Sequence, residues 1–311
     1  MTLLRAILHL RSPFGTPLAG DTFFGQACHA ARDALGEAAL TDLLEGYTSG
    51  RPWLVVSDGF PHGYLPRPSV PVPPHADPSR RKEDKAKHWI PHAAAAQPLN
   101  TLLGTAVSDE AAFGEHSVPV QASAYHNTLN RLSGTTGTGE FAPYTQPQTH
   151  YAAGQRIDLW CVLDETRLPV EGLRQLFAQI GSLGYGRDAS IGLGKFDIES
   201  LQEVSLPAPD HADAWWSLGP CAPQGQGFDG TRSSWRVLTR FGRHGGALAL
   251  GASPFKNPVI LAAAGAIFVP EKGFSPQHFV GSGLGQVSVA QPATVHQGYA
   301  PVVAVQVGET P

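Results

Sequence analysis

Stretches of alternating and periodic hydrophobicity divide the chain into short predicted strands and two amphipathic helices. Residues 3–10 form an apolar run of strand length, which the breaker-rich segment 11–17 closes. Residues 21–35 place apolar side chains at helical spacing, and Asp21 or Thr22 is positioned to cap this helix. The apolar stripe consists of Phe23, Phe24, Ala27, Ala30, Ala31 and Ala34. A buried strand followed by a helix is the first half of a split β-α-β unit.

Regular patterning stops after a short predicted strand at residues 53–57. From residue 66 to about residue 116 prolines cluster, and a mixed-sign charge run at residues 80–87 replaces any periodicity. Because mixed charge is usual on a solvated surface, we expect this excursion to be a partly disordered loop. Order returns at residues 118–126, and the polar segment 127–140, with its Gly/Thr tip, is typical of a projecting hairpin.

The second half of the split unit follows the hairpin. Residues 157–163 predict a strong strand, residues 170–180 an amphipathic helix, and residues 195–200 a further strand. The complete order is β-α-β-β-α-β, the ferredoxin-like or RRM-like plan. We therefore expect a first domain at residues 1–203, with an insertion at about residues 66–150.

Strands dominate the remainder of the chain, residues 210–311, which follows a predicted linker at residues 206–210. The patterning places strands at residues 234–240, 258–263, 266–269, 287–290 and 300–307. Little helical periodicity accompanies them. We expect a second, degenerate sheet domain packed on the first.

A glycine-rich loop at residues 180–196 joins the second helix to the last strand of the first domain. Glycine allows positive φ and lets backbone N–H groups approach an anion, while Arg187 and Lys195 supply positive charge. The alternative is a plain turn. The glycines follow a helix and precede a strand, whereas nucleotide-binding loops have the reverse order, which argues against an NTPase or a dehydrogenase.

Composition narrows the class of protein only moderately. The 311 residues carry a formal charge of -4, so a strongly basic nucleic-acid binder is excluded, although a local basic face is not. Three widely spaced cysteines form neither a CxxC metal site nor a disulfide framework. Residues 1–10 do not match a signal peptide, and no apolar run has the length of a membrane span. These features lead us to expect a soluble cytoplasmic protein.

Several motifs together resemble the RAMP superfamily of CRISPR proteins. More narrowly, the chain resembles the fourth subunit of the Csm-type (type III-A) effector complex, in the group that caps the 5′ end of the guide RNA. The motifs lie at residues 20–26, 57–68, 130–136, 184–196, 257–261 and 296–302. They therefore come from both halves of the chain.

The resemblance implies an α+β fold with two ferredoxin-like domains and a non-catalytic role in antiviral defence. Such a subunit binds the repeat-derived 5′ tag of the crRNA, contacts the large polymerase-like signature subunit and a backbone RAMP subunit, and meets target RNA indirectly. It implies no cofactor, no metal and no membrane partner. The candidate RNA-binding residues are Gly184, Tyr185, Gly186, Arg187, Ser190, Gly192, Gly194 and Lys195 in the loop, and His126, Asn130 and Arg131 at the projecting hairpin.

Aromatic side chains near these motifs are candidates for stacking on splayed bases. They are Tyr125, Phe141, Tyr185 and Phe196. Phe196 begins a strand and is expected in the core, whereas Tyr185 lies between two glycines and is expected at the surface.

Two catalytic alternatives stay open. The first is a metal-independent endoribonuclease that processes precursor guide RNA with a histidine as general base, for which the candidates are His9, His29, His62 and His126. The second is a backbone-type subunit that cleaves target RNA through a loop aspartate, for which Asp188 and Asp21 are the candidates. Asp21 fits helix capping better.

Overall fold

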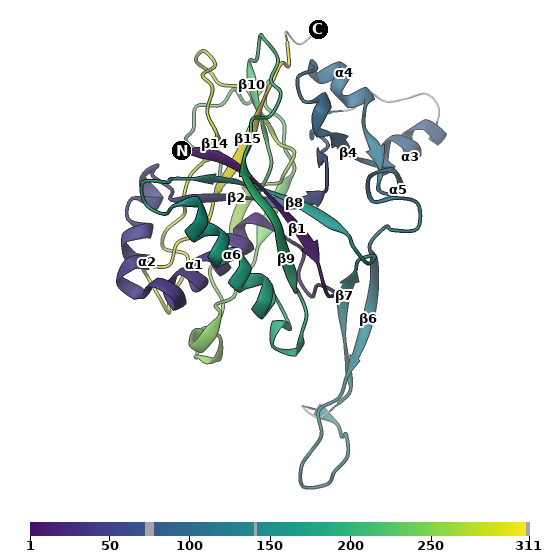
Figure 1. Ribbon diagram of the computed structural model, residues 1–311, viewed down its shortest axis with the longest axis vertical. Helices are drawn as coiled ribbons and strands as arrows, with labels where there is room; N and C mark the ends of the chain where they lie inside the picture. Colours follow the sequence, from purple (N-terminus) through teal and green to yellow (C-terminus); the bar gives the residue numbers. More distant parts are fainter. Residues whose placement is uncertain (72–77, 140–141, 309–311) are drawn as a thin grey trace.

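The computed structural model describes residues 1–71, 78–139 and 142–308 (Figure 1). In this part the chain is an α+β protein with five sheets of two to four strands, and all strand pairs are antiparallel. None of its described helices has both the length and the apolar composition needed to cross a lipid bilayer. Cys28, Cys161 and Cys221 are all free thiols, in agreement with their spacing in the sequence.

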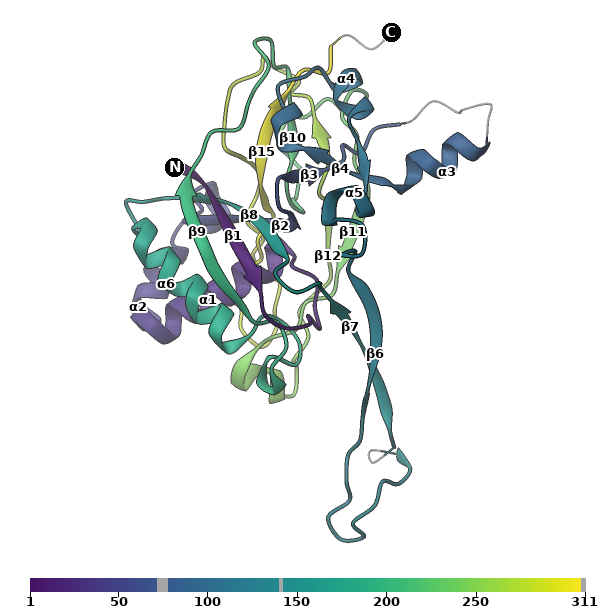
Figure 2. The same ribbon diagram turned by 45° about the vertical axis from the view of Figure 1, so that its right-hand side comes forward.

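The first sheet contains four strands. They are β1 (Thr2–Leu10), β2 (Leu54–Pro61), β8 (Arg156–Leu163) and β9 (Phe196–Glu203). The strand order is β2-β8-β1-β9 (Figures 1 and 2), so each β-α-β half encloses one strand of the other half. The predicted β-α-β-β-α-β order is thus confirmed for this sheet.

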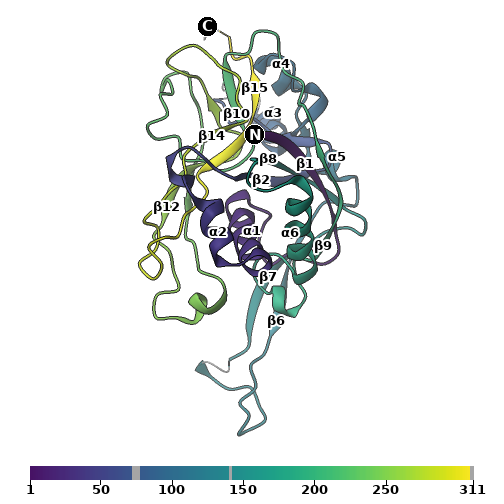
Figure 3. The ribbon, with the colours of Figure 1, turned by 60° about the vertical axis from the view of Figure 1, so that its left-hand side comes forward.

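Two long helices lie side by side on one face of this sheet, with a shorter helix next to them (Figure 3). They are α1 (Gly20–Leu35) and α6 (Val170–Leu183), and the shorter helix is α2 (Glu37–Leu44). Phe23 of α1 packs edge-on against Phe177 of α6 with ring centres 4.9 Å apart, and both rings are buried. The predicted apolar stripe of α1 therefore faces the core, as expected from its spacing.

The start of α1 differs from the prediction. The helix begins at Gly20, its N-cap is Ala19, and neither Asp21 nor Thr22 caps it. The N–H of Gly20 donates instead to Oδ1 of Asp58 on β2, at 2.8 Å. A side chain at Gly20 would place its Cβ 2.2 Å from the Val56 carbonyl oxygen, so α1 begins at a glycine pressed against β2. The cap comes from a distant strand, which local sequence rules do not consider.

The described residues of the insertion, 64–71 and 78–113, are ordered, so the prediction of a partly disordered loop is wrong for them. The elements are β3 (Tyr64–Pro66), α3 (Pro78–Ala86), β4 (Lys87–Pro91), η2 (His92–Ala94), α4 (Leu99–Gly104), β5 (Val107–Ser108) and α5 (Asp109–Phe113). The three strands pair in the order β3-β4-β5.

Charge pairing and contact with the main hydrophobic core explain why the described part of this insertion is ordered. Lys87 Nζ reaches back to Glu83 at 2.9 Å and Asp84 at 3.3 Å across the last turn of α3. Leu65, Ile90 and Leu102 are fully buried and join the main hydrophobic core. The sequence shows no periodicity here because α3 is polar and the buried residues come from separate short elements.

A two-stranded hairpin projects from the body, as predicted (Figure 2). Its strands are β6 (Val120–His126) and β7 (Tyr144–His150), paired from Val120↔His150 to His126↔Tyr144. Residues 127–139 of the predicted segment 127–140 form its distal part, and residue 140 lies outside the described residues.

Between residues 210 and 308 the fold is built of short strands, and the described helical structure there is the single turn η5 (Gly246–Leu250). The strands are β10 (Ala214–Ser217), β11 (Val237–Arg240), β12 (Val259–Ala262), β13 (Ile267–Phe268), β14 (Phe279–Gly281) and β15 (Tyr299–Val305). Four of them form a sheet in the order β13-β10-β15-β14, and β11 pairs with β12. The predicted strand at residues 287–290 is wrong, because this segment has no ladder partner. The prediction missed β10 and β14, which are too short for a clear period.

The two halves of the chain share buried structure. Gln297 is fully buried, and its side-chain amide donates to the Val56 carbonyl at 2.8 Å and accepts from the Val56 N–H at 2.9 Å. Val56 lies on β2, an edge strand of the first sheet, so the amide pairs with that edge as a neighbouring strand would. Tyr299 donates its hydroxyl to the Tyr47 carbonyl at 2.6 Å. The segment of residues 206–210 between the halves has no regular secondary structure, as expected.

Candidate nucleic-acid interface

Three segments that are far apart in sequence meet where the hairpin joins the body. The backbones of Phe14 and Thr149 exchange hydrogen bonds of 2.9 and 2.8 Å, which fixes the base of β7 to the loop after β1. The glycine-rich loop joins the same place, because Gly194 N–H donates to the Pro13 carbonyl at 2.8 Å and Arg187 N–H to Thr16 Oγ1 at 2.9 Å. The hairpin is therefore held in a defined direction from its root.

The glycines of this loop take the predicted positive φ angles. The values are +106° at Gly184, +78° at Gly186, +101° at Gly192 and +71° at Gly194. A Cβ at Gly194 would lie 2.1 Å from the carbonyl oxygen of Tyr185, and a Cβ at Gly184 2.4 Å from that of Leu193. The glycines thus allow the loop to fold closely on itself.

We expected the glycine N–H groups of the loop to face an anion, but most of them donate to carbonyl groups of the protein. Gly184 donates to the Ile180 carbonyl at 2.8 Å, Gly192 to that of Ala189 at 3.0 Å, and Gly194 to that of Pro13. These donors are engaged within the protein. The backbone of the loop therefore contributes structure at these three positions, and a phosphate contact would have to use other groups.

The two cations of the loop differ in availability. The Arg187 guanidinium bonds to Gln146 Oε1 at 2.6 Å, to the Pro147 carbonyl, and to Asp188 at 3.1 Å. It ties the loop to β7. It also forms an ion pair with Asp188, one of the two aspartates considered as catalytic residues for RNA cleavage. Lys195 and Ser190 are exposed and present their side chains to solvent.

The expected surface position of Tyr185 is wrong. Its side chain is 0% exposed, and its ring stacks on Phe23 with centres 5.5 Å apart. The hydroxyl donates to the Pro17 carbonyl at 2.9 Å and accepts the Ala19 N–H at 3.1 Å, while burial raises the pKa of the phenol. The loop closes on itself through Tyr185 N–H and the Gly194 carbonyl, at 2.9 Å, which turns the ring inward. Phe196 is buried in the core, as predicted.

The outer hairpin exposes apolar side chains to solvent. Tyr125 is 84% exposed and Leu132 is 100% exposed, and Leu129 and Tyr144 are also open. Among the predicted residues, Arg131 is exposed, whereas Asn130 organises the tip by accepting the Leu132 N–H at 2.9 Å. Exposed apolar groups on an extended hairpin indicate a surface that a partner covers.

His126 ends β6 below this tip. Its ring stacks on Tyr144, with centres 5.3 Å apart and planes 14° from parallel. Its Nε2 is buried and has no hydrogen-bond partner among the described residues. The fourth stacking candidate, Phe141, lies outside the described residues.

The structure therefore separates the predicted RNA-binding residues into two groups. Those of the glycine-rich loop lie at the root of the hairpin, whereas Asn130 and Arg131 lie beyond the last strand pair, His126↔Tyr144, in the distal part of the hairpin. A ligand that touches both groups must run along the hairpin. This geometry suits an extended polymer better than a compact ligand.

One of the candidate catalytic histidines has a carboxylate partner that the sequence did not reveal. His62 Nδ1 lies 2.7 Å from Oδ1 of Asp158, and the N–H of Gly63 donates to Oδ2 at 2.9 Å. Both oxygens of this buried carboxylate therefore close the turn between β2 and β3. Asp21 lies 2.8 Å from the Arg240 guanidinium and 3.5 Å from His296, so it forms an ion pair between the two halves.

Comparisons with known proteins give matches at the level of structure. No family model matches the sequence, and a search of curated proteins finds no match. The crystal structure of a Csm1–Csm4 cassette in complex with pppApA contains a chain that matches with a TM-score of 0.59 and 13% identity, over 100% of both chains. The Csm3–Csm4 subcomplex of the type III-A CRISPR-Cas interference complex matches with a TM-score of 0.60 and 11% identity, over 98% of this chain and 100% of the other. Csm4 is common to both structures, so the chain has the fold of Csm4 over its whole length.

Proposed function

We propose that this chain is a non-catalytic, crRNA-binding subunit of a type III CRISPR effector complex, which seats the repeat-derived 5′ tag of the guide. The observation that supports this most is the whole-chain match to Csm4 in assemblies with Csm1 and with Csm3. We place a ferredoxin-like domain at residues 1–203 and a degenerate one at residues 210–311. The second contains a four-stranded antiparallel sheet, and the described helical structure in it is limited to η5.

The hairpin is the element we assign to the guide. Single-stranded RNA is held by aromatic stacking and by cations along its backbone, and each stacked base contributes about 1–3 kcal/mol. Tyr125 and Arg131 supply these two chemistries on the outer hairpin, and Lys195 supplies a cation at its root. The track would run along β6 and β7 toward the glycine-rich loop.

Protein partners would occupy other surfaces. The β11–β12 ribbon and the segments next to it expose large apolar side chains to solvent. They are Val237, Phe241, Leu250, Phe255 and Ile260. Exposed apolar groups of this size are uncommon on proteins that work alone, so we assign this face to a neighbouring subunit of the complex.

The endoribonuclease is the second candidate function, and the His62–Asp158 pair is the observation that favours it. A histidine oriented by a carboxylate is an arrangement that general bases use. Asp158 is nevertheless fully used in closing the β2–β3 turn, which explains the pair without catalysis. We therefore assign this pair a structural role.

The test uses the complex assembled from the co-expressed large subunit, backbone subunit and this chain. Labelled repeat RNA is incubated with it, with and without a chelator. We expect protection of the 5′ tag and no cleavage. A discrete product that disappears in the His62→Ala variant would establish the nuclease instead.

A matched pair of variants tests the hairpin. Leu132→Ser and Leu183→Ser each replace one exposed leucine, the first at the hairpin tip and the second at the end of α6. We expect weaker guide retention for Leu132→Ser alone, measured by filter binding. Equal retention by both variants would contradict the assignment of the tip to RNA.

A further inference from the structure

A large cleft lies between the insertion and the C-terminal half, and none of the predicted RNA-binding residues lines it. Its volume is about 830 Å³, within the range of small-molecule binding sites. The insertion contributes β3, β4 and the end of α5, and the opposite side comes from residues 234–236 and 264. A backbone hydrogen bond from Ser69 to the Gly265 carbonyl, at 2.7 Å, holds the two sides together.

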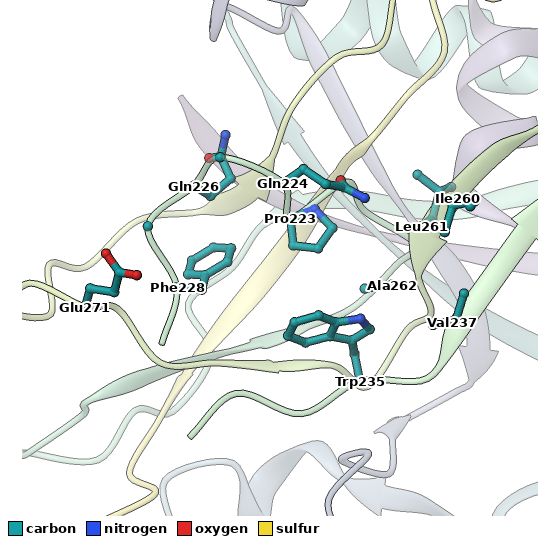
Figure 4. A pocket seen from close by; sticks show the side chains of 12 residues that line it. Pro223, Gln224, Gln226, Phe228, Trp235, Val237, Ile260, Leu261, Ala262 and Glu271 are labelled. Atoms are coloured by element: carbon teal, nitrogen blue, oxygen red, sulfur yellow. The ribbon is translucent and has the colours of Figure 1, made fainter. Parts of the chain in front are cut away.

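Aromatic rings of fixed orientation line this cleft. Trp89 donates its Nε1 hydrogen to Asp109 at 2.7 Å and packs edge-on to Phe113, with ring centres 6.1 Å apart. Trp235, from the C-terminal half, also lines the cleft. It is 38% exposed, and its ring is tilted against that of Phe268, with ring centres 5.7 Å apart. It also borders a smaller hollow of about 340 Å³, where it lies between Phe228 and Val237 (Figure 4). The anchored rings leave aromatic surface available to a planar ligand.

Positive side chains stand beside these rings. Lys85 and Arg236 line the cleft, are exposed, and have no ion-pair or side-chain hydrogen-bond partner in the described part of the chain. Lys87 also lines it but is paired with Glu83 and Asp84. Two cations therefore remain available for an anionic group of a ligand.

One acidic side chain lines the same cleft. Asp58 accepts the Gly20 N–H at 2.8 Å, and burial raises the pKa of its carboxyl to about 7. Its protonated form can donate a hydrogen bond as well as accept one, and both are needed to match the edge of a nucleobase. A phosphate would avoid it and favour the cations.

One end of the cleft is lined by residues from the root of the hairpin. Tyr151 directly follows β7, lines the cleft, and packs edge-on against Phe14 at 5.6 Å. Pro17 and Leu18, from the loop that holds the hairpin, line it as well. A polymer that leaves the hairpin at its root therefore reaches the cleft.

We propose that this cleft binds one nucleotide unit, with its base against Trp89 and Trp235 and its phosphate against Lys85 and Arg236. The unit is either a nucleotide of the guide's 5′ tag, which rests on the proposed function, or a free mononucleotide. Residues 57–68, a motif of the sequence resemblance, supply Asp58, Phe60 and Arg67 to the cleft. The motif at residues 57–68 would therefore contact the nucleotide, whereas no residue of the glycine-rich loop lines the cleft.

Matched variants of the assembled complex test the proposal. Lys85→Ala is compared with Lys82→Ala on the same helix, because Lys82 is exposed and lies outside the cleft. Trp235→Ala is compared with Val289→Ala, which also shortens an exposed apolar side chain in the same half but lies outside the cleft and the proposed subunit face. Arg236→Ala provides a second charge variant at the surface, should Trp235→Ala fail to fold.

Two binding measurements distinguish the sources of the nucleotide. For the tag, we expect Trp235→Ala to weaken guide binding fivefold to hundredfold, and 5-iodouridine placed in the tag to crosslink to peptides containing Trp89 or Trp235. For a free mononucleotide, equilibrium dialysis of labelled AMP and UMP would show a site that Lys85→Ala and Arg236→Ala lose, while guide binding is unchanged.

Equal behaviour of the cleft variants and their controls in both measurements, with no crosslink to the cleft, would overturn the proposal. Guide binding that is intact in all variants, together with loss of the mononucleotide site, supports the free-nucleotide source. If the wild-type complex does not bind tag RNA, the proposed function fails, and the dialysis measurement still decides the cleft.

Discussion

Replacing Tyr185 with phenylalanine separates the buried role of this ring from a role in RNA stacking. The change keeps the ring and its contact with Phe23 but removes the hydroxyl. The Ala19 N–H, at the start of α1, then loses its acceptor at 3.1 Å. The Pro17 carbonyl loses its donor at 2.9 Å, but Pro17 is exposed and water can replace that bond.

The magnitude follows from the group left unpaired. A buried N–H without a partner costs about 1–3 kcal/mol, and we expect the free energy of unfolding to fall by this amount. For domains of 150–250 residues, each kcal/mol lowers Tm by about 2–4 °C. Thermal unfolding followed by circular dichroism measures the shift, and urea titration gives an independent value.

The control is Tyr125→Phe on the hairpin, where the hydroxyl faces solvent and no loss of stability is expected. Guide affinity of Tyr185→Phe should equal that of the wild type. An unchanged Tm, combined with a loss of guide affinity for Tyr185→Ala in a folded protein, would refute the placement of this ring inside the loop.

Three further predictions concern the joint between the halves, a titrating group and the loop cations. Gln297→Leu leaves the Val56 N–H and carbonyl without their partner, so we expect about 2–4 kcal/mol less stability in urea titration, and a loss below 0.5 kcal/mol would contradict this. Burial raises the pKa of Asp58 from 3.8 to about 7, so its protonated form is favoured in the folded state and its contribution is lost progressively as pH rises from about 4 to about 7. Asp58→Asn should therefore gain Tm relative to wild type over this range, and parallel Tm profiles would count against it. Lys195→Ala should lower the salt slope of guide binding by about 0.7, whereas Arg187→Ala, whose guanidinium is used within the protein, should leave the slope unchanged and increase hydrogen exchange at the base of β7. The reverse pattern would mean that Arg187 contacts phosphate.

Local pattern was sufficient for the first sheet and its helices. The continuous apolar run of β1 predicts a buried strand, the 3.6-residue spacing in α1 and α6 reports one buried face on each helix, and the order of these elements predicts the split β-α-β plan. The positive φ angles at Gly184 and Gly194 were also predictable, because residue type alone determines which positions tolerate them.

Tertiary contacts decided how the helix α1 is capped, which way Tyr185 points and which short segments form strands. The cap of α1 comes from Asp58, the direction of Tyr185 depends on Gly194 and the loop after β1, and β10 exists because β13 and β15 pair with it. The cleft brings Trp89 and Trp235 together from positions 146 residues apart. Each of these features depends on partners that are distant in sequence, and local propensity and period contain no information about such pairs.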